Sequence, residues 1–359
     1  MDKALFEEFP PITDEQWRFQ VLQDMKGAAP ETLEWASHEG ITLKPYYRSN
    51  NEAKVQVPVR PAEACWIRQD ITVSNAFEAN IVALDALQHG ATALWFNCSA
   101  PVNLETLLKG ILLEHIQTDW YVADSSTLDG LAAVIKTRAM DAAWVKGSVE
   151  FKPTDKVAYF QKYQPLLPDY KLFTIAPSAA ETLTEQTAKQ LTEANKIVQE
   201  LTEAGISAKM VLGHIKFDIE IGTDYFFEIA RIRSLRALWM VICRQYVPDY
   251  ASPAFIHATN KKVAPEKDGY YEMIRQTTQA LSAAIGGVDS LSLVPHIAAA
   301  DRTPAFQTRI ARNVQLILQH ESHLDVITDP AAGSWYLEEL TSQLAQKAWE
   351  HFVSSTQKA

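Results

Sequence analysis

The sequence predicts an α/β protein, a (β/α)8 TIM barrel with an N-terminal extended arm. From about Glu63, short apolar runs alternate eight times with longer amphipathic segments, the pattern of such a barrel. The chain has 359 residues, a length that suits one large barrel, and 47% of them are hydrophobic, enough for a large core. Residues 1–62 lack the alternation. The predicted domains are therefore an arm over 1–62, available for subunit contacts, and a barrel over 63–359.

The arm is expected to begin with a helix. Thr13 is the predicted N-cap, and Gln16 three residues later completes a capping box, so the helix should end near Gly27. The stretch from Gly40 to Pro61 has no clear periodicity and should be irregular. Such an arm wraps either its own domain or a partner subunit, and the sequence leaves both alternatives open.

The barrel elements follow from the same alternation of patterns. The eight predicted strands cover 65–71, 92–98, 120–123, 148–151, 171–176, 208–215, 254–259 and 290–294. The predicted helices cover 74–89, 103–115, 127–143, 179–204, 223–246, 269–285 and 306–320, and Ser334 is expected to cap a final helix. A doubly wound open sheet is the structural alternative.

Charge and cysteine usage exclude several classes of protein. Asp plus Glu number 44 against 33 Lys plus Arg, a net charge of −11, which makes nucleic acids and anionic membranes poor partners. The three cysteines are far apart, so neither a disulfide framework nor a cysteine zinc site is expected. There is no signal peptide pattern and no run of 18 apolar residues, so the expected location is the cytoplasm.

Two pairs of residues are candidates for a site inside the barrel. His214 and His257 fall in the C-terminal halves of the sixth and seventh predicted strands, where barrel enzymes place catalytic groups. They are either an acid–base pair or phosphate contact, or hydrogen-bonded polar residues of the barrel wall. Arg68 and Asp70 alternate on the first strand and share a face. If that face is the interior, Arg68 needs a carboxylate partner, from Asp70 or from across the barrel.

The helix after the sixth strand carries an unusual number of arginines. Arg231, Arg233, Arg236 and Arg244 favour a salt-bridged surface exposed to solvent or to another subunit, with an anion site as the alternative. The opposite stripe, from Phe226 to Ile242, is too apolar for a helix exposed on one side, which suggests a second contact, for example with another chain.

Two stretches near the C-terminus carry a resemblance. Residues 308–322 contain the sequence RIARNVQLIL, and residues 326–338 contain DPAAGSWYLE. Both resemble the end of the substrate barrel of methylmalonyl-CoA mutases, and Trp66-Ile67-Arg68-Gln69 is similar to that family's first strand. The resemblance covers nearly the whole chain, is strongest over 222–352, and implies the same barrel fold.

The chain departs from the family's catalytic pattern at several places. No His has the spacing Asp-x-His-x-x-Gly by which the family ligates cobalt, and the chain stops just past the barrel. Asp70 stands where the family's catalytic chain has Tyr, residues 175–178 lack its Tyr-His pair, and Thr259 replaces a substrate-contacting Gln. The resemblance therefore implies a degenerate substrate site with no catalytic, cofactor-binding or metal-ligating residue. Its candidate residues are Arg68, Asp70, His214, His257 and Thr259, with Trp66, Phe96, Trp120 and Phe173 available to fill the interior.

The resemblance implies a non-catalytic small (beta) subunit in a heterodimer. The partner is expected to be a large subunit that binds adenosylcobalamin and interconverts (R)-methylmalonyl-CoA and succinyl-CoA, while this chain binds no cofactor and is itself inactive. A first alternative is an acyl-CoA-binding mutase barrel that works with a cobalamin domain on a separate chain. A second is a homodimeric binding or scaffold protein.

Overall fold

The computed structural model describes residues 12–48, 54–60, 65–261, 269–295, 303–324 and 326–357. The chain divides into two compact units, Met1–Asn51 and Glu52–Ala359. No helix in the described ranges is both long and apolar enough to cross a bilayer.

The first unit contains one helix, a short 3-10 turn and a small ribbon. The helix α1 (Asp14–Asp24) begins with the predicted capping box, which is confirmed. Thr13 Oγ1 accepts a hydrogen bond from the Gln16 amide, and Gln16 Oε1 accepts one from the Thr13 amide. The 3-10 turn η1 (Pro30–Leu33) follows, and β1 (Trp35–Ala36) then pairs antiparallel with β2 (Thr42–Leu43).

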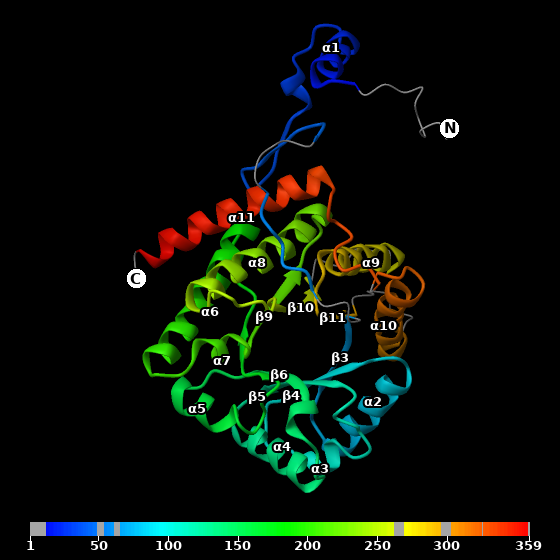
Figure 1. Ribbon diagram of the computed structural model, residues 1–359. Helices are drawn as coiled ribbons and strands as arrows, with labels where there is room; N and C mark the ends of the chain where they lie inside the picture. Colours follow the sequence, from blue (N-terminus) through cyan, green and yellow to red (C-terminus); the bar gives the residue numbers. More distant parts are fainter. Residues whose placement is uncertain are drawn as a thin grey trace, which may run out of the picture. The chain divides into compact units, whose positions relative to one another are not determined.

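The second unit is a closed parallel barrel (Figure 1). Its strands are β3 (Trp66–Thr72), β4 (Ala93–Cys98), β5 (Gln117–Val122), β6 (Lys146–Glu150), β7 (Tyr170–Lys171), β8 (Phe173–Ile175), β9 (Ile215–Ile221), β10 (Phe255–Asn260) and β11 (Ser290–Ser292). The sheet order is β7-β6-β5-β4-β3-β11-β10-β9-β8. Its two end strands are joined by Leu172 alone and are halves of one barrel strand. The TIM-barrel prediction is therefore confirmed, and the open doubly wound sheet is wrong.

Helices surround the strands, as expected from the alternation. They are α2 (Ala76–Gln88), α3 (Leu104–Leu107), α4 (Ser126–Thr137), α5 (Lys156–Tyr163), α6 (Leu183–Glu203), α7 (Ala208–Leu212), α8 (Tyr225–Tyr246), α9 (Gly269–Gly286), α10 (Pro304–His320) and α11 (Trp335–Thr356), with a 3-10 turn η2 (Ala142–Trp144). Ser334 caps α11 as predicted, because its Oγ accepts from the Leu337 amide. The predicted helix over 103–115 is reduced to α3, and α5 was not predicted.

The prediction of a sixth strand over 208–215 is wrong. Residues Ala208–Leu212 form α7, and the strand is Ile215–Ile221. A short apolar run does not distinguish helix from strand by periodicity alone. The real strand, IKFDIEI, alternates apolar and polar residues without exception, which is the pattern of a strand with two different faces.

The apolar side chains of the strands face the helices rather than the barrel axis. Phe96 and Trp120 belong to the same buried cluster as Ala83 of α2 and Leu107 of α3. Phe173 stacks on Phe160 of α5. The prediction that Phe96, Trp120 and Phe173 fill the interior is therefore wrong. By alternation, Trp66 alone of the four suggested residues shares the side of Arg68, and it is half-buried.

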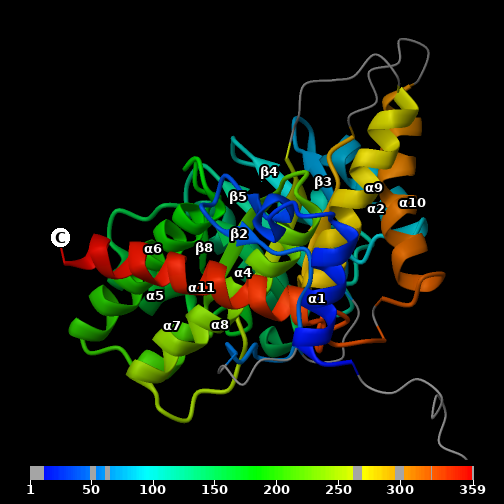
Figure 2. The ribbon, with the colours of Figure 1, turned by 90° about the horizontal axis from the view of Figure 1, so that it is seen from above.

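The prediction for α8 is also wrong. Arg231, Arg233 and Arg236 are 1–2% exposed, and only Arg244 is exposed to solvent. Helix α11 packs along α8 and α6 on the side away from the barrel, as Figures 1 and 2 both show. A further side of α8 is therefore covered by the C-terminal helix of the same chain, while Phe226 and Val241 stay exposed.

Candidate functional site

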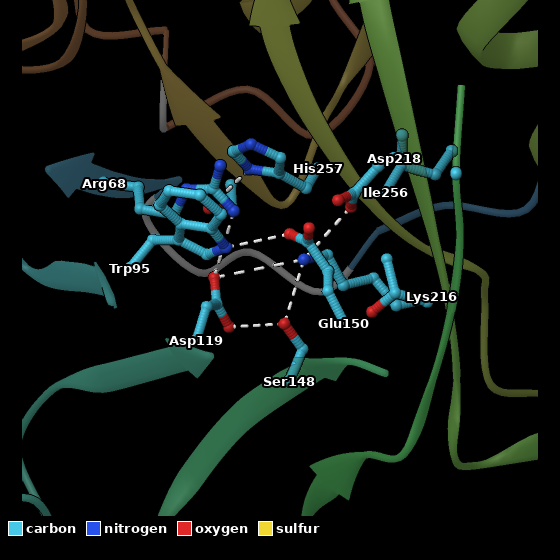
Figure 3. A network of polar contacts seen from close by, with 12 residues as sticks. Arg68, Trp95, Asp119, Ser148, Glu150, Lys216, Asp218, Ile256 and His257 are labelled. Atoms are coloured by element: carbon cyan, nitrogen blue, oxygen red, sulfur yellow. Dashed lines mark hydrogen bonds and ion pairs between the residues drawn. The ribbon is translucent and has the colours of Figure 1, made fainter. Parts of the chain in front are cut away.

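The interior of the barrel holds a network of charged side chains (Figure 3). Asp70, Trp95, Asp119 and Ser148 are successive register partners on β3, β4, β5 and β6. Asp218 and His257 are register partners on β9 and β10, and Ser290 of β11 follows. Register partners in a parallel sheet point to the same face, so these polar side chains share one face of the sheet. When the sheet closes into a barrel, that face becomes the interior.

Lys216 lies at the centre of this network and is fully buried. Its Nζ is 2.9 Å from Ser148 Oγ, 3.0 Å from Asp218 Oδ1 and 4.0 Å from Asp119 Oδ2. Asp119 is also fully buried, and its Oδ1 accepts from Ser148 Oγ at 2.6 Å. Burial alone would raise the pKa of Asp119, but the charges of Lys216 and Arg68 and its hydrogen bonds hold that pKa below its usual value. Asp119 is therefore a carboxylate.

Arg68 has both of the partners considered from the sequence. Its Nε donates to Asp70 Oδ1 at 2.9 Å, and its Nη1 lies 3.4 Å from Asp119 Oδ2 across the barrel. The guanidinium also lies 5.6 Å from the centre of the Trp95 ring, within the range of a cation–π contact. The structure thus confirms an ion pair on one face of β3, in which Arg68 is buried and Asp70 is half-buried. A role of Arg68 and Asp70 in substrate binding stays a prediction.

Glu150 of β6 and Asp218 of β9 add two carboxyl groups to the network. Trp95 Nε1 donates to Glu150 Oε1 at 2.8 Å. Burial, and then the charge of Asp218, raise the pKa of Glu150 to about 7, although Lys216 and Arg68 oppose the shift. Burial also raises the pKa of Asp218. Glu150 consequently retains its proton at a pH where an exposed carboxyl has lost its own.

The proton bound by Glu150 makes the free energy of unfolding depend on pH. Because the pKa of Glu150 rises from 4.5 to about 7 on folding, the native state binds more protons than the unfolded state within that window, and stability falls as pH rises through it. As the pH rises from about 5 to about 8, we expect the free energy of unfolding to fall less in Glu150→Gln than in the wild type. Melting temperatures of both proteins over this range test the effect, and parallel curves would contradict it.

His257 is buried within the same network and is neutral. Its Nδ1 lies 3.1 Å from Ser290 Oγ and its Nε2 lies 3.4 Å from Ser292 Oγ. Burial, followed by the positive charges of Arg68 and Lys216, lowers its pKa well below the ordinary value. Thr259, two residues along β10, is the register partner of Ser292, and its Oγ1 is buried without a hydrogen-bond partner.

His214 lies outside this site. It precedes β9 rather than ending a strand, its ring packs edge-on against Phe160, and Nδ1 contacts the Tyr170 carbonyl oxygen. Because active sites of barrels lie at the opposite, C-terminal ends of the strands, a joint acid–base role with His257 is wrong. The structure therefore assembles Arg68, Asp70, His257 and Thr259 but not His214.

Several residues of the network were not singled out from the sequence. They are Trp95, Asp119, Ser148, Glu150, Lys216 and Asp218. The signal was present in the alternation of β9, where Lys216 and Asp218 occupy every second position between apolar residues. Within the described ranges, no group of three or more His, Cys, Asp or Glu side chains has the arrangement of a metal site.

Comparison with known proteins shows which family this chain resembles. The family model described as methylmalonyl-CoA mutase matches residues 170–358. The methylmalonyl-CoA mutase small subunit of Porphyromonas gingivalis is 31% identical over 98% of this chain and 64% of its own length. The small subunit of Streptomyces virginiae is 27% identical over 97% of this chain and 64% of its own length. The chain thus spans just under two thirds of the length of these relatives.

Proposed function

Because this chain belongs to the methylmalonyl-CoA mutase family, we propose that it is a non-catalytic small subunit. In this proposal it forms a heterodimer with a large subunit that interconverts (R)-methylmalonyl-CoA and succinyl-CoA. Adenosylcobalamin, which supplies the radical in that reaction, is then bound by the large subunit. The relatives from Porphyromonas gingivalis and Streptomyces virginiae, both named small subunits, support this assignment.

The ion network at the centre of the barrel carries the proposal. Lys216 and Asp119 are fully buried, and Arg68 is 7% exposed, so these charges occupy the space around the barrel axis. A substrate that entered the barrel would have to separate Lys216 from Asp218 or Arg68 from Asp119. Leaving a buried charge without its partner costs several kcal/mol. The barrel is accordingly better suited to a structural role than to threading a long substrate.

The histidine of the ion network, His257, does not fit a ligand for cobalt. Both of its ring nitrogens lie against serine hydroxyls. A histidine ligand needs one ring nitrogen directed at the metal and is usually oriented by a partner on the other. We therefore assign no step of the radical reaction to this chain.

The first unit offers a surface for the large subunit. Helix α1 has no buried residue, and the apolar side chains of Phe19 and Leu22 are exposed on it. Trp35 of β1 is likewise exposed. Exposed apolar groups such as these are available for contact with another protein. We propose that this unit contributes to the interface with the large subunit.

Co-expression with the matching large subunit tests the proposed function. We expect a stable one-to-one complex with mutase activity in the presence of adenosylcobalamin, and no activity from this chain alone. CoA thioesters should leave the melting temperature of the isolated chain unchanged, since a ligand of the native state raises it. A clear rise would contradict the proposal and favour the alternative of an acyl-CoA-binding barrel.

A matched pair of variants tests the role of the first unit in this complex. Phe19 and Phe77 are 62% and 63% exposed, on α1 and on α2 of the barrel respectively. We expect Phe19→Asp to weaken the complex at least tenfold, the cost of about 1.4 kcal/mol at a buried apolar contact. Phe77→Asp should leave the affinity unchanged. Equal affinities of both variants and the wild type would exclude the first unit from the interface.

A further inference from the structure

A second polar feature lies outside the barrel interior, in a pocket between the sheet and its helices. The pocket has a volume of about 30 Å³. Its apolar lining includes Ile67 of β3, Leu291 of β11 and Leu318 of α10. Three polar side chains, Arg60, Gln315 and Gln319, also reach it. By alternation Ile67 and Leu291 face away from the barrel axis, so this pocket is separate from the ion network.

Arg60 is a buried cation without a counter-charge among the described residues. Its exposed fraction is 8%, and its Nη1 donates to the Val288 carbonyl oxygen at 2.8 Å, but Nε has no partner. The described residues give it no ion pair with a carboxylate; Asp289, which is near the pocket, binds Arg236 at 3.0 Å. Burial raises the pKa of the Cys65 thiol in the pocket to about 12, so Cys65 stays neutral.

The two glutamines leave further hydrogen-bonding capacity in the same pocket. Gln315 is 5% exposed, and the Oε1 atoms of Gln315 and Gln319 are buried without partners. The Nε2 of Gln315 reaches the Ala311 carbonyl oxygen only at 3.5 Å, the long limit of a hydrogen bond. Rotation of either side-chain amide about its last bond therefore turns its NH2 group toward the pocket, and at most a weak hydrogen bond is given up.

We propose that this pocket binds a small carboxylate of the size of acetate. The Arg60 guanidinium, which has no carboxylate partner among the described residues, calls for one negative charge, since a buried charge is stable only when it is paired. The carboxylate accepts from Arg60 Nε and from a turned glutamine amide, while its methyl group packs against Ile67, Leu291 and Leu318. The volume fits a ligand of only a few heavy atoms, because one water molecule occupies about 10–15 Å³ on the same measure.

Thermal unfolding of the full chain in acetate tests this site. The melting temperature is measured over a series of sodium acetate concentrations, with sodium chloride added to keep the ionic strength constant. We expect it to rise with acetate, as it must for a ligand that binds only the native state. Broadening of the 13C-acetate signal on addition of the protein gives an independent readout of binding.

Three variants assign the effect to the pocket. Arg60→Met should abolish both signals while keeping the protein folded, because an uncompensated buried charge is replaced by an apolar chain of similar length. Arg309→Met removes a positive charge from the exposed side of α10 and should keep both signals. Ala284→Leu retains Arg60 but fills the pocket from α9 and should also abolish them.

The remaining outcomes overturn the proposal. A melting temperature that does not change as acetate replaces chloride shows that the pocket has no preference for a carboxylate over chloride. An equal rise in separate acetate and chloride series that start from low salt assigns the stabilisation to anions in general. An acetate effect that persists in Arg60→Met places the binding elsewhere on the chain.

Discussion

Replacement of Arg233 by leucine is expected to lower the free energy of unfolding by about 3–5 kcal/mol, the usual result of removing one partner from a buried ion pair. The side chain of Arg233 is 2% exposed. Its Nη2 lies 2.9 Å from Asp329 Oδ2 and 2.8 Å from Glu338 Oε1, and its Nη1 donates to Thr341 Oγ1 at 3.1 Å. The substitution leaves two half-buried carboxylates close together without a cation.

This ion triad gives a physical reason for the DPAAGSWYLE segment. Asp329 begins the turn before α11, and Glu338 lies in the first turn of that helix, so Arg233 of α8 fixes both ends of the segment. Glu338 Oε1 also accepts from the Gly333 amide at 3.2 Å. The contacts dock α11 onto the arginine-bearing side of α8. The segment that most clearly carries the family resemblance is therefore structural here.

Urea unfolding measures the effect of the substitution, with Arg309→Leu as the matched control. Arg309 is exposed on α10 and contacts the Phe306 ring, so its loss should change stability by less than about 1 kcal/mol. A similarly small loss for Arg233→Leu would mean that the triad does not hold α11 in place. Replacing Asp329 and Glu338 by their amides in the Arg233→Leu background should restore part of the stability, because unpaired charges are removed.

The elements that follow from local chemistry could be predicted from the sequence. The capping residues Thr13 and Ser334 begin helices where expected, because a side chain near its own backbone decides a helix start. The barrel followed from repeated alternation of strands and helices. By contrast, the pairing of Lys216 with Asp119 joins β9 to β5, and no local pattern specifies which strands face each other across a barrel.

Which side of each strand or helix faces the barrel interior was predicted less well, because this too depends on contacts between distant segments. A parallel sheet covered by helices is expected to be apolar on both sides, so the sequence alone does not say whether Trp120 and Phe96 face the axis or the helices. In this chain the interior face is largely polar, with Trp66 and Trp95 among its residues, and most apolar residues of the strands contact the helices instead. Arg233 is buried because α11 forms a second layer over α8, a contact between segments far apart in sequence. Arg236 is buried against Asp289 and the carbonyl oxygens of Ala254 and Gly287.

Replacement of Lys216 by methionine is expected to lower the free energy of unfolding by a similar amount, about 3–5 kcal/mol. The substitution keeps most of the volume but leaves Asp218 without the cation at 3.0 Å and Asp119 with Arg68 alone, at 3.4 Å. Lys209→Met, on the exposed side of α7, is the matched control and should be nearly neutral.

The pH dependence of the loss separates a charge effect from a packing effect. Lys216 lowers the pKa values of Asp119, Glu150 and Asp218, so its removal should favour their protonated forms in the native state. Lys216→Met should therefore be closest to the wild type at low pH and lose most stability above neutral pH. Adding Asp218→Asn should recover part of the loss at high pH, because it removes the carboxylate that faced Lys216. A loss independent of pH and unaffected by Asp218→Asn would show that Lys216 acts through its volume alone, and the network would no longer explain why the barrel centre is closed.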